Sequence, residues 1–396
     1  MDFAPWPFFS DDEIQAVVNV LKSGRINQWT GNEINGFETE FSRYIGTNHA
    51  IALTNGSLAL DLALMALDIK KGDEVIVTPR SFVASAACVA LREATPVFVD
   101  VDPVSQNITL ETISKAAGKK TKAVIAVNLA GWPCDLKRIK LFCEQQNIFL
   151  IEDCAQSLGA KFDGSMAGSF GDCAIFSFCQ DKIMTTGGEG GMLVTNNPDI
   201  WKKVWSYKDH GKDYDTVFLQ EHQPGFKWLV NRFGTNCRMT EMQAAMGRVM
   251  LKKVDGWVKK RREFAELYNT AFDRIPGLRT TRPETYVYHS YYKYYVFINQ
   301  DELKGSWNRD AVIDSLTKAG VPCNIGVCPE IYNEKAFKKG FYKIHGAQKN
   351  RETVFLPAAR QLGETSIMFM VHPTLSPESI HYVIDQVKHV MKKAVR

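Results

Sequence analysis

Lys182 is placed where an amine could do carbonyl chemistry. It lies in a polar break directly after an apolar run over 172–178, and four glycines surround Glu189 shortly after it. Glycines permit positive φ values and let the backbone approach a bulky group closely. A lysine at a strand end, followed by such a turn, suits a covalent amine that reaches the carbonyl of a cofactor. A solvated loop lysine is the alternative interpretation of the same local sequence.

Asp153 is a second side chain of a reactive type, because it directly follows a predicted strand over 148–152. Ligands of open α/β sheets bind beyond the carboxyl ends of strands. A carboxylate at that place could hold a pyridine nitrogen in its protonated form, since an opposite charge favours the charged state. A protonated ring is the electron sink of pyridoxal chemistry. The alternative is an aspartate that only caps the next helix.

Gly56 and Ser57 form a turn that leads straight from a predicted strand over 50–54 into a helix over 58–67. The free N–H groups and the dipole of a helix start attract an anion such as phosphate. Gly56 permits the turn, and Ser57 adds a hydroxyl. Small residues also begin many helices that bind nothing, so the turn alone does not establish a phosphate site.

Two further side chains have both a packing and a binding interpretation. Phe82 follows the predicted strand 74–77, where its ring could stack on a pyridine ring or belong to the core. Lys293 lies in the tyrosine-rich strand predicted over 290–298. It could contact a substrate, but we expect it on the solvent face of that strand.

A sheet is needed to bring these residues together. Apolar segments alternate mostly with helical patterns from residue 50 to residue 195, which predicts a mostly parallel sheet with helices on both faces. The seven predicted strands are 50–54, 74–77, 96–100, 123–128, 148–152, 172–178 and 192–195. Before them, Ser10 and Glu13 form a capping box that opens a helix through Leu21, and Gly24 closes it.

The composition argues against several classes of partner. The formal net charge of +4 is small for 396 residues, so nucleic acid is not expected. The nine cysteines form no CxxC pair and no metal-ligand spacing with histidine, which indicates buried thiols in a reducing cytoplasm and no metal site. The apolar stretch 58–69 is too short to span a bilayer, and no signal peptide is recognisable. We therefore expect a cytoplasmic protein without membrane insertion.

The segments around these candidates resemble the DegT/StrS-type sugar-nucleotide aminotransferases, which use pyridoxal phosphate. The resemblance covers nearly the whole chain, and its four main blocks occur in the expected order. They are TNGSLALDLAL (54–64), IEDCAQSLGA (151–160), DCAIFSFCQDKIMTTGGEGGMLVTN (172–196) and GTNCRMTEMQAAMG (234–247). The resemblance implies fold type I, with a seven-stranded mostly parallel sheet between helices. It also implies a large cofactor-binding domain over 1–255 and a smaller C-terminal α/β domain over 256–396.

The same resemblance implies roles for individual residues. Lys182 would be the Schiff-base lysine and the proton carrier, and Asp153 the partner of the ring nitrogen. Asn236 would reach the cofactor phosphate of a second subunit, so we expect a homodimer with shared sites. The implied cofactor contacts are Gly56, Ser57, Phe82, Asp153, Gln156, Ser177, Lys182 and Asn236, and the residues implied to lie near the substrate are Trp29, Thr30, His210 and Arg238.

The resemblance finally implies a reaction, in which glutamate donates its amino group, 2-oxoglutarate leaves, and a keto sugar on a nucleoside diphosphate receives the amine. The turn 184–191 is similar to the form found in relatives that act on 4-keto-6-deoxy sugars, although it has one glycine more. The product would serve amino-sugar or O-antigen-type polysaccharide (lipopolysaccharide) synthesis. The alternatives are amination of a 3-keto sugar, a sugar dehydratase, another fold-type-I enzyme, or a catalytically silent relative with a regulatory or assembly role.

Overall fold

One large sheet forms the centre of the structure, a computed structural model that describes residues 1–221, 224–225, 227–337, 340–349 and 353–396. Its strands lie in the order β1-β9-β8-β5-β4-β2-β3-β14. The bounds are β1 His49–Leu53, β2 Glu74–Val77, β3 Thr95–Phe98, β4 Thr121–Val127, β5 Phe149–Asp153, β8 Cys173–Ser177, β9 Gly191–Thr195 and β14 Lys343–Ile344.

All neighbouring strands of this sheet run parallel except at β9, which is antiparallel to β1 and to β8. The mostly parallel sheet is therefore confirmed, and all seven predicted strands are present. The eighth strand, β14, was not predicted, because it contributes two residues from the C-terminal part of the chain to the edge of β3. Every residue of β2 and of β9 is buried, so both faces of the sheet are covered.

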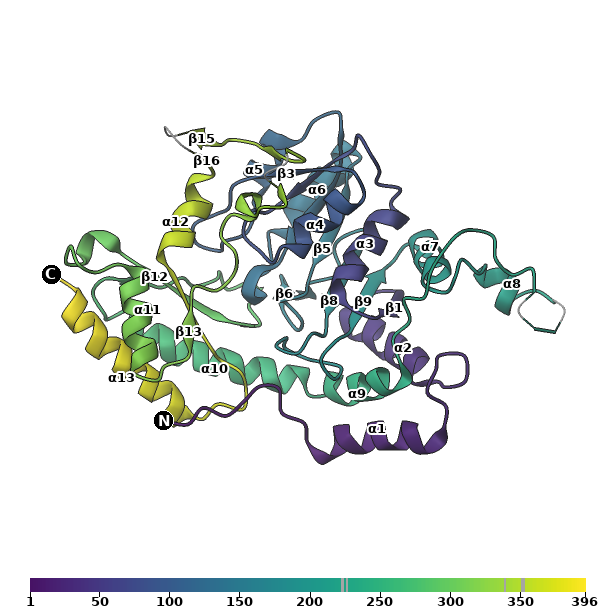
Figure 1. Ribbon diagram of the computed structural model, residues 1–396, viewed down its shortest axis with the longest axis horizontal. Coiled ribbons are helices and arrows are strands. Elements are labelled where there is room, and N and C mark those ends of the chain that lie inside the picture. Colours follow the sequence, from purple (N-terminus) through teal and green to yellow (C-terminus); the bar gives the residue numbers. More distant parts are fainter. Residues whose placement is uncertain (222–223, 226, 338–339, 350–352) are drawn as a thin grey trace.

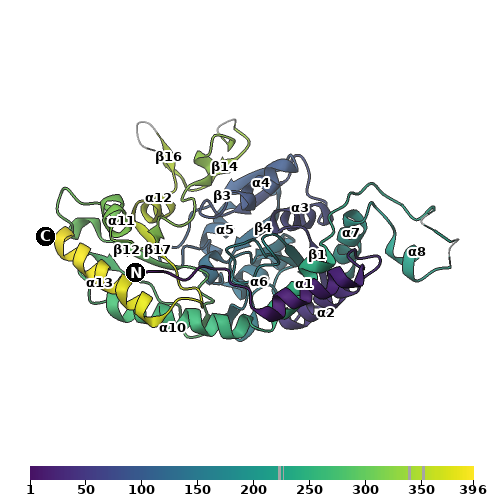
Figure 2. The same ribbon diagram turned by 60° about the horizontal axis from the view of Figure 1, so that its bottom comes forward.

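Helices surround this sheet and occupy much of the C-terminal part (Figures 1 and 2). Their bounds are α1 Asp11–Ser23, α2 Glu33–Ile45, α3 Gly56–Ala66, α4 Ala84–Leu91, α5 Leu110–Ala116, α6 Leu136–Gln146, α7 Pro198–Lys208, α8 Tyr214–Phe218, α9 Glu241–Leu251, α10 Val254–Phe272, α11 Arg309–Lys318, α12 Pro357–Thr365 and α13 Pro377–Ala394. None of the helices in the described ranges is long and apolar enough to span a membrane. All nine cysteines are free thiols.

The first helix, α1, has the predicted capping box at its start and the predicted glycine after its end, although it runs to Ser23 rather than to Leu21. The Ser10 N–H group donates to the Glu13 carboxylate at 2.8 Å, which closes the capping box. Gly24 ends the helix with a φ of 67°, the left-handed conformation that glycine adopts without strain. α1 and α2 both pack against α9, so the N-terminal helices are tied to the segment that leads out of the large sheet.

A second hydrophobic core lies in the C-terminal part, between α10, α11 and α13 and a four-stranded antiparallel sheet. α9 and α10 are separate helices, divided at residues 252–253, and α10 runs from beneath the large sheet into this second core (Figure 2). These observations support our proposal of a domain division near residue 255. The small sheet comprises β10 Leu278–Arg279, β12 Tyr294–Ile298, β13 Cys323–Asn324 and β17 Ser366–Phe369.

The strand predicted over 290–298 is shorter, because β12 begins only at Tyr294. The Ser290 N–H group donates to the Gly131 carbonyl at 2.9 Å, and the Tyr292 N–H group donates to the Ala130 carbonyl at 2.8 Å. These two bonds hold the backbone before β12 against the turn after β4. Tyr292 is consequently placed at the boundary between the two cores.

The remaining short elements connect these units. They are β6 Lys161–Phe162, β7 Ser165–Met166, β11 Val287–Tyr288, β15 Gln348–Lys349, β16 Val354–Phe355, and the 3₁₀ turns η1 Leu129–Gly131, η2 Gln300–Glu302 and η3 Ile331–Asn333.

The buried carboxylate of Glu152 in β5 fixes the loop that leads into β8. It is fully buried and accepts N–H bonds from Gly168 at 2.7 Å and from Phe170 and Gly171 at 2.8 Å each. Burial raises the pKa of Glu152, and the three backbone donors oppose that shift. The loop therefore depends on this acceptor for the hydrogen bonds of three backbone groups.

We predict that Glu152→Ala lowers the free energy of unfolding by about 3 kcal/mol or more, because three buried donors lose their acceptor. Glu144→Ala is the control, since Glu144 is an exposed residue whose ion pair with Lys140 measures 3.8 Å, and its loss should cost under about 1 kcal/mol. Urea unfolding of both variants measures the difference. Equal losses for the two variants would contradict the anchoring role.

Candidate active site

A cavity of about 810 Å³ lies beyond the carboxyl ends of β5 and β8, where the sheet meets the C-terminal part of the chain. Residues from the start of α3, from the segment after β2 and from the loop after β8 line one side. Residues from β12, β13 and β17 or beside them line the other. Of the predicted site residues, the cavity brings together Gly56, Ser57, Phe82, Asp153, Gln156, Ser177 and Lys182.

Lys182 projects into this cavity and is only 17% exposed, so it is not a solvated loop side chain. Its Nζ atom lies 3.4 Å from the Tyr292 hydroxyl and 3.9 Å from the Asp181 carboxylate. The Lys182 carbonyl accepts the indole N–H bond of Trp6 at 2.8 Å, which fixes the backbone at this residue. The amine is therefore held by a rigid backbone and can reach a carbonyl group in the cavity.

Asp153, the last residue of β5, is a buried carboxylate in the wall of the cavity. It accepts hydrogen bonds from the Ser85 hydroxyl at 2.8 Å and from the Ala155 N–H group at 3.1 Å. Burial raises the pKa of Asp153, while these two donors and the charge of Lys182 lower it. A cationic group in the cavity would stabilise the ionised carboxylate further.

The start of α3 presents backbone N–H groups to the cavity. The Asn55 side chain accepts the Leu58 N–H bond at 2.9 Å, and Gly56 and Ser57 line the cavity next to it. A Cβ atom on Gly56 would lie 2.7 Å from the Ser177 Cβ, so only glycine lets α3 approach the end of β8 this closely. The N–H groups of a first helical turn have no partner within the helix, so an anion can accept them here.

The glycine turn after Lys182 packs against the same segment. A Cβ atom on Gly191 would lie 2.4 Å from the Asn55 carbonyl carbon, so this glycine allows the first residue of β9 to lie against the turn before α3. The sequence predicted that these glycines let the backbone approach a bulky group. At Gly191, that group is the backbone of Asn55.

Two other cavity residues offer contacts to a flat ring. Phe82 is 64% exposed although it lies in the cavity wall, which leaves a face of its ring free. The side-chain amide oxygen of Gln156 accepts a hydrogen bond from the Ala130 N–H group at 2.9 Å, which orients this side chain at the cavity. A nucleophilic amine, a buried carboxylate, an anion-binding helix start and an exposed aromatic ring are the groups that pyridoxal phosphate requires, so the residues present fit this cofactor.

Five predicted residues lie outside this cavity in the single chain. Asn236 and His210 are exposed, and Arg238 pairs with the Asp209 carboxylate at 2.8 Å. Trp29 stacks on Phe218 with 6.1 Å between the ring centroids. Their roles toward a cofactor or substrate therefore remain predictions.

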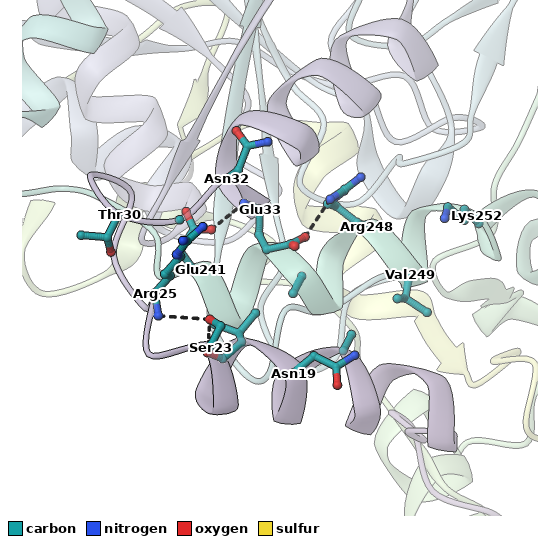
Figure 3. A pocket seen from close by; sticks show the side chains of 14 residues that line it. Asn19, Ser23, Arg25, Thr30, Asn32, Glu33, Glu241, Arg248, Val249 and Lys252 are labelled. Atoms are coloured by element: carbon teal, nitrogen blue, oxygen red, sulfur yellow. Dashed lines mark hydrogen bonds and ion pairs between the residues drawn. The ribbon is translucent and has the colours of Figure 1, made fainter.

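Thr30, the fifth of these residues, lines a different cavity of about 670 Å³ between α1 and α9 (Figure 3). Glu241 and Arg248 lie in the wall of this cavity, and Arg248 pairs with Glu33 at 2.7 Å. Neither Lys182 nor Asp153 contributes to it. It is therefore separate from the candidate active site.

The sequence did not single out Asp181 and Tyr292, which both contact the Lys182 amine. Asp181 accepts a hydrogen bond from the Tyr292 hydroxyl and lies 3.7 Å from the Lys293 Nζ atom. Burial raises the pKa of Asp181, but Lys182, Tyr292 and Lys293 together lower it. The expectation that Lys293 lies on a solvent face is wrong, because its side chain lines the cavity and is 15% exposed.

Comparison with known proteins agrees with this geometry. An aminotransferase structure from Psychrobacter cryohalolentis is 46% identical, has a TM-score of 0.93, and the match covers 99% of each chain. The GDP-perosamine synthase of Escherichia coli O157:H7 is 31% identical over 96% of each chain. The E. coli GDP-4-keto-6-deoxy-D-mannose-3-dehydratase with bound hydrated pyridoxal phosphate is 26% identical, with a TM-score of 0.86 over 98% of this chain and 100% of that one.

These likenesses establish a fold-type-I enzyme architecture with pyridoxal phosphate as its cofactor. The sequence profile of the DegT/DnrJ/EryC1/StrS aminotransferase family matches residues 8–388, nearly the whole chain. The protein belongs to the DegT/DnrJ/EryC1/StrS aminotransferase family.

Proposed function

We propose that the protein transfers the amino group of glutamate to a 4-keto-6-deoxy sugar attached to a nucleoside diphosphate. The observation that carries this proposal is the cavity that unites Lys182, Asp153 and the start of α3. The GDP-perosamine synthase and the GDP-linked keto-sugar dehydratase among the relatives support a nucleotide-linked keto sugar as the substrate. We also propose a cytoplasmic location and a role in amino-sugar or O-antigen-type polysaccharide synthesis.

When bound, pyridoxal phosphate supplies a carbonyl group that exchanges amines and a ring that delocalises the electron pair of a deprotonated carbon. Lys182 would act as the amine nucleophile and, once released, carry the proton between the carbon atoms of substrate and cofactor. Asp153 would keep a proton on the ring nitrogen, because its buried charge favours a cationic partner. The N–H groups at the start of α3 and the Ser177 hydroxyl would hold the phosphate. Phe82 would stack on the ring.

The turn that follows Lys182 supports carbon 4 as the site of amination, because its sequence is similar to that of relatives that act on 4-keto sugars. Thr185 is fully buried, and its hydroxyl donates to the Phe178 carbonyl at 2.9 Å and accepts the Gly188 N–H bond at 3.0 Å. The shape of the turn is therefore fixed from inside, next to the reacting amine. Because reacting atoms must approach within roughly 3–3.5 Å, a rigid turn at this place can select which sugar carbon reacts.

We predict that the new nitrogen is found on carbon 4. Matched 3-keto and 4-keto 6-deoxy sugar nucleotides should be offered with glutamate, and proton–carbon NMR should locate the amine in the product. Nitrogen on carbon 3, with the 4-keto substrate unchanged, would reject the proposed regiochemistry while leaving the transaminase reaction intact. A lack of turnover with every keto sugar would instead favour the silent relative.

We predict that Asp153→Asn lowers the turnover rate by roughly 100-fold or more while cofactor occupancy stays high. The amide keeps hydrogen-bonding capacity but lacks the charge that favours a protonated ring nitrogen. Ser85→Ala is the matched control, because it removes the 2.8 Å hydrogen bond to Asp153 and leaves the carboxylate in place. If Asp153 only caps the next helix, the Asp153→Asn variant should keep normal turnover and lose about 1 kcal/mol of folding stability.

We further propose a homodimer in which Asn236 completes the site of the second subunit. The segment around α8 projects away from the rest of the chain (Figures 1 and 2). Trp228 and Phe233 in this segment are 92% and 98% exposed, which is unusual for large apolar side chains that no partner covers. Asn236 is exposed and follows this segment directly.

We predict that two inactive variants, Lys182→Ala and Asn236→Ala, regain activity when their subunits exchange. A mixed dimer has one site with both native residues, so equal mixing should restore roughly a quarter of the wild-type rate. The mixture before exchange is the control. Mass spectrometry of the mixed dimer should first demonstrate the exchange of subunits. If activity does not recover after that exchange, the shared site is contradicted. Full activity of Asn236→Ala alone would contradict it as well.

A further inference from the structure

A second, smaller cavity of about 220 Å³, here called the side cavity, adjoins the Lys182 cavity. Four residues line both cavities, namely Asp181, Tyr292, Lys293 and Met370. The outer wall of the side cavity includes residues 3–6 and 370–372. A molecule held at the Lys182 amine can therefore extend one small group into the side cavity.

Arg261 of α10 lines the side cavity with hydrogen-bonding capacity to spare. It is 1% exposed, and its Nη1 atom donates to the Tyr292 carbonyl at 3.1 Å. Its Nε and Nη2 atoms have no hydrogen-bond partner among the described residues. The Trp6 ring lies 5.3 Å from the guanidinium carbon and shields it from water. Buried polar groups are almost always paired, so these two nitrogens indicate a ligand that accepts hydrogen bonds.

Lys293 supplies a second cation where the two cavities meet. Its Nζ atom lies 3.7 Å from the Asp181 carboxylate and 3.5 Å from the Met370 sulfur. An ammonium group carries three N–H bonds, so one remains for a ligand. Burial lowers the pKa of Lys293 and the charge of Asp181 opposes this, while Arg261 and Lys182 lower it further. An anion bound beside it would relieve the repulsion among these cations.

The charges around the side cavity are unbalanced. Lys293 and Arg261 are basic, and Asp181 is the one carboxylate among the residues that line it. His372 also lines it, but burial and the nearby cations lower its pKa to about 3, so it is neutral at pH 7. One more anionic group of small size would pair with Lys293 and Arg261.

We propose that the side cavity binds the α-carboxylate of the amino-group donor through Lys293 and Arg261. This inference rests on the proposed transaminase function and assigns its donor subsite. The α-carboxylate is bonded to the carbon that bears the amino group, so it stays beside Lys182 while the amine is transferred. A nucleoside diphosphate is too large for 220 Å³ and belongs in the wider cavity.

The test uses the holoenzyme of the wild type, Lys293→Met and Arg261→Lys. The conversion of the cofactor by glutamate alone, followed by absorbance, gives the glutamate concentration at half saturation. Calorimetric titration with 2-oxoglutarate gives an affinity that does not depend on turnover. We expect Lys293→Met to weaken the binding of glutamate and of 2-oxoglutarate by about tenfold or more, because a charge-assisted hydrogen bond is lost. Arg261→Lys keeps a cation without the two free donors and should show a smaller loss.

Two comparisons separate this subsite from a general loss of structure. 4-Aminobutyrate lacks the α-carboxylate, so Lys293→Met should lose the preference for glutamate over 4-aminobutyrate that the wild type shows. Affinity for the sugar nucleotide should fall by a smaller factor than affinity for glutamate in the same variant. The control is Lys119→Met, which removes an exposed lysine that lines neither cavity.

The opposite results overturn the assignment. Unchanged glutamate and 2-oxoglutarate binding in Lys293→Met would show that the side cavity does not receive the donor. Weakened sugar-nucleotide binding alone would assign it to the other substrate. If the wild type aminates keto sugars from a donor without a carboxylate, the donor subsite is rejected and the transaminase function stands. If the wild type is inactive with all donors, the proposed function itself is rejected.

Discussion

Two consecutive carboxylates at the end of β5 are the constraint on which the site depends. Side chains alternate between the faces of a strand, so Glu152 and Asp153 point to opposite sides of the sheet. Glu152 holds the backbone of the loop before β8, and Asp153 accepts the Ser85 hydroxyl beyond β2. Burying two adjacent carboxylates costs free energy unless each is well paired. Glu152 therefore fixes the loop on one side of the sheet, and Asp153 lies in the wall of the cofactor cavity on the other side.

The cavity also requires contact between segments that are distant in sequence. The backbone at Ser290 and Tyr292 hydrogen-bonds to the turn after β4, which leaves the Tyr292 hydroxyl next to Lys182. Gly131 makes this approach possible, because a Cβ atom there would lie 2.5 Å from the Ser290 hydroxyl oxygen. Small changes in how the C-terminal part contacts the large sheet would therefore move the Tyr292 hydroxyl relative to the Lys182 amine.

Much of the large sheet could be predicted from sequence, because its strands are short apolar runs separated by helical patterns. Lys182 and Asp153 were identifiable since each directly follows such a run, and the structure places both in one cavity. Lys293 was misplaced because an alternating strand pattern assigns a lysine to the solvent face, whereas the backbone there is bent by its bonds to the β4 turn. Asp181 and Arg261 both contact Tyr292, which lies 111 and 31 positions away in the sequence, and a single sequence contains no local signal for such contacts.

The contacts of Trp6 have a consequence for the order in which the protein can fold. Its indole donates to the Lys182 carbonyl and stacks on His372, so it joins the start of the chain to a segment near its end. During synthesis residue 6 emerges long before residue 372, and contacts between such distant residues form slowly because a long loop must close. The large sheet, apart from its edge strand β14, can be assembled while the chain is still growing. The backbone of the reactive lysine would reach its final restraint only after the C-terminal part has been made.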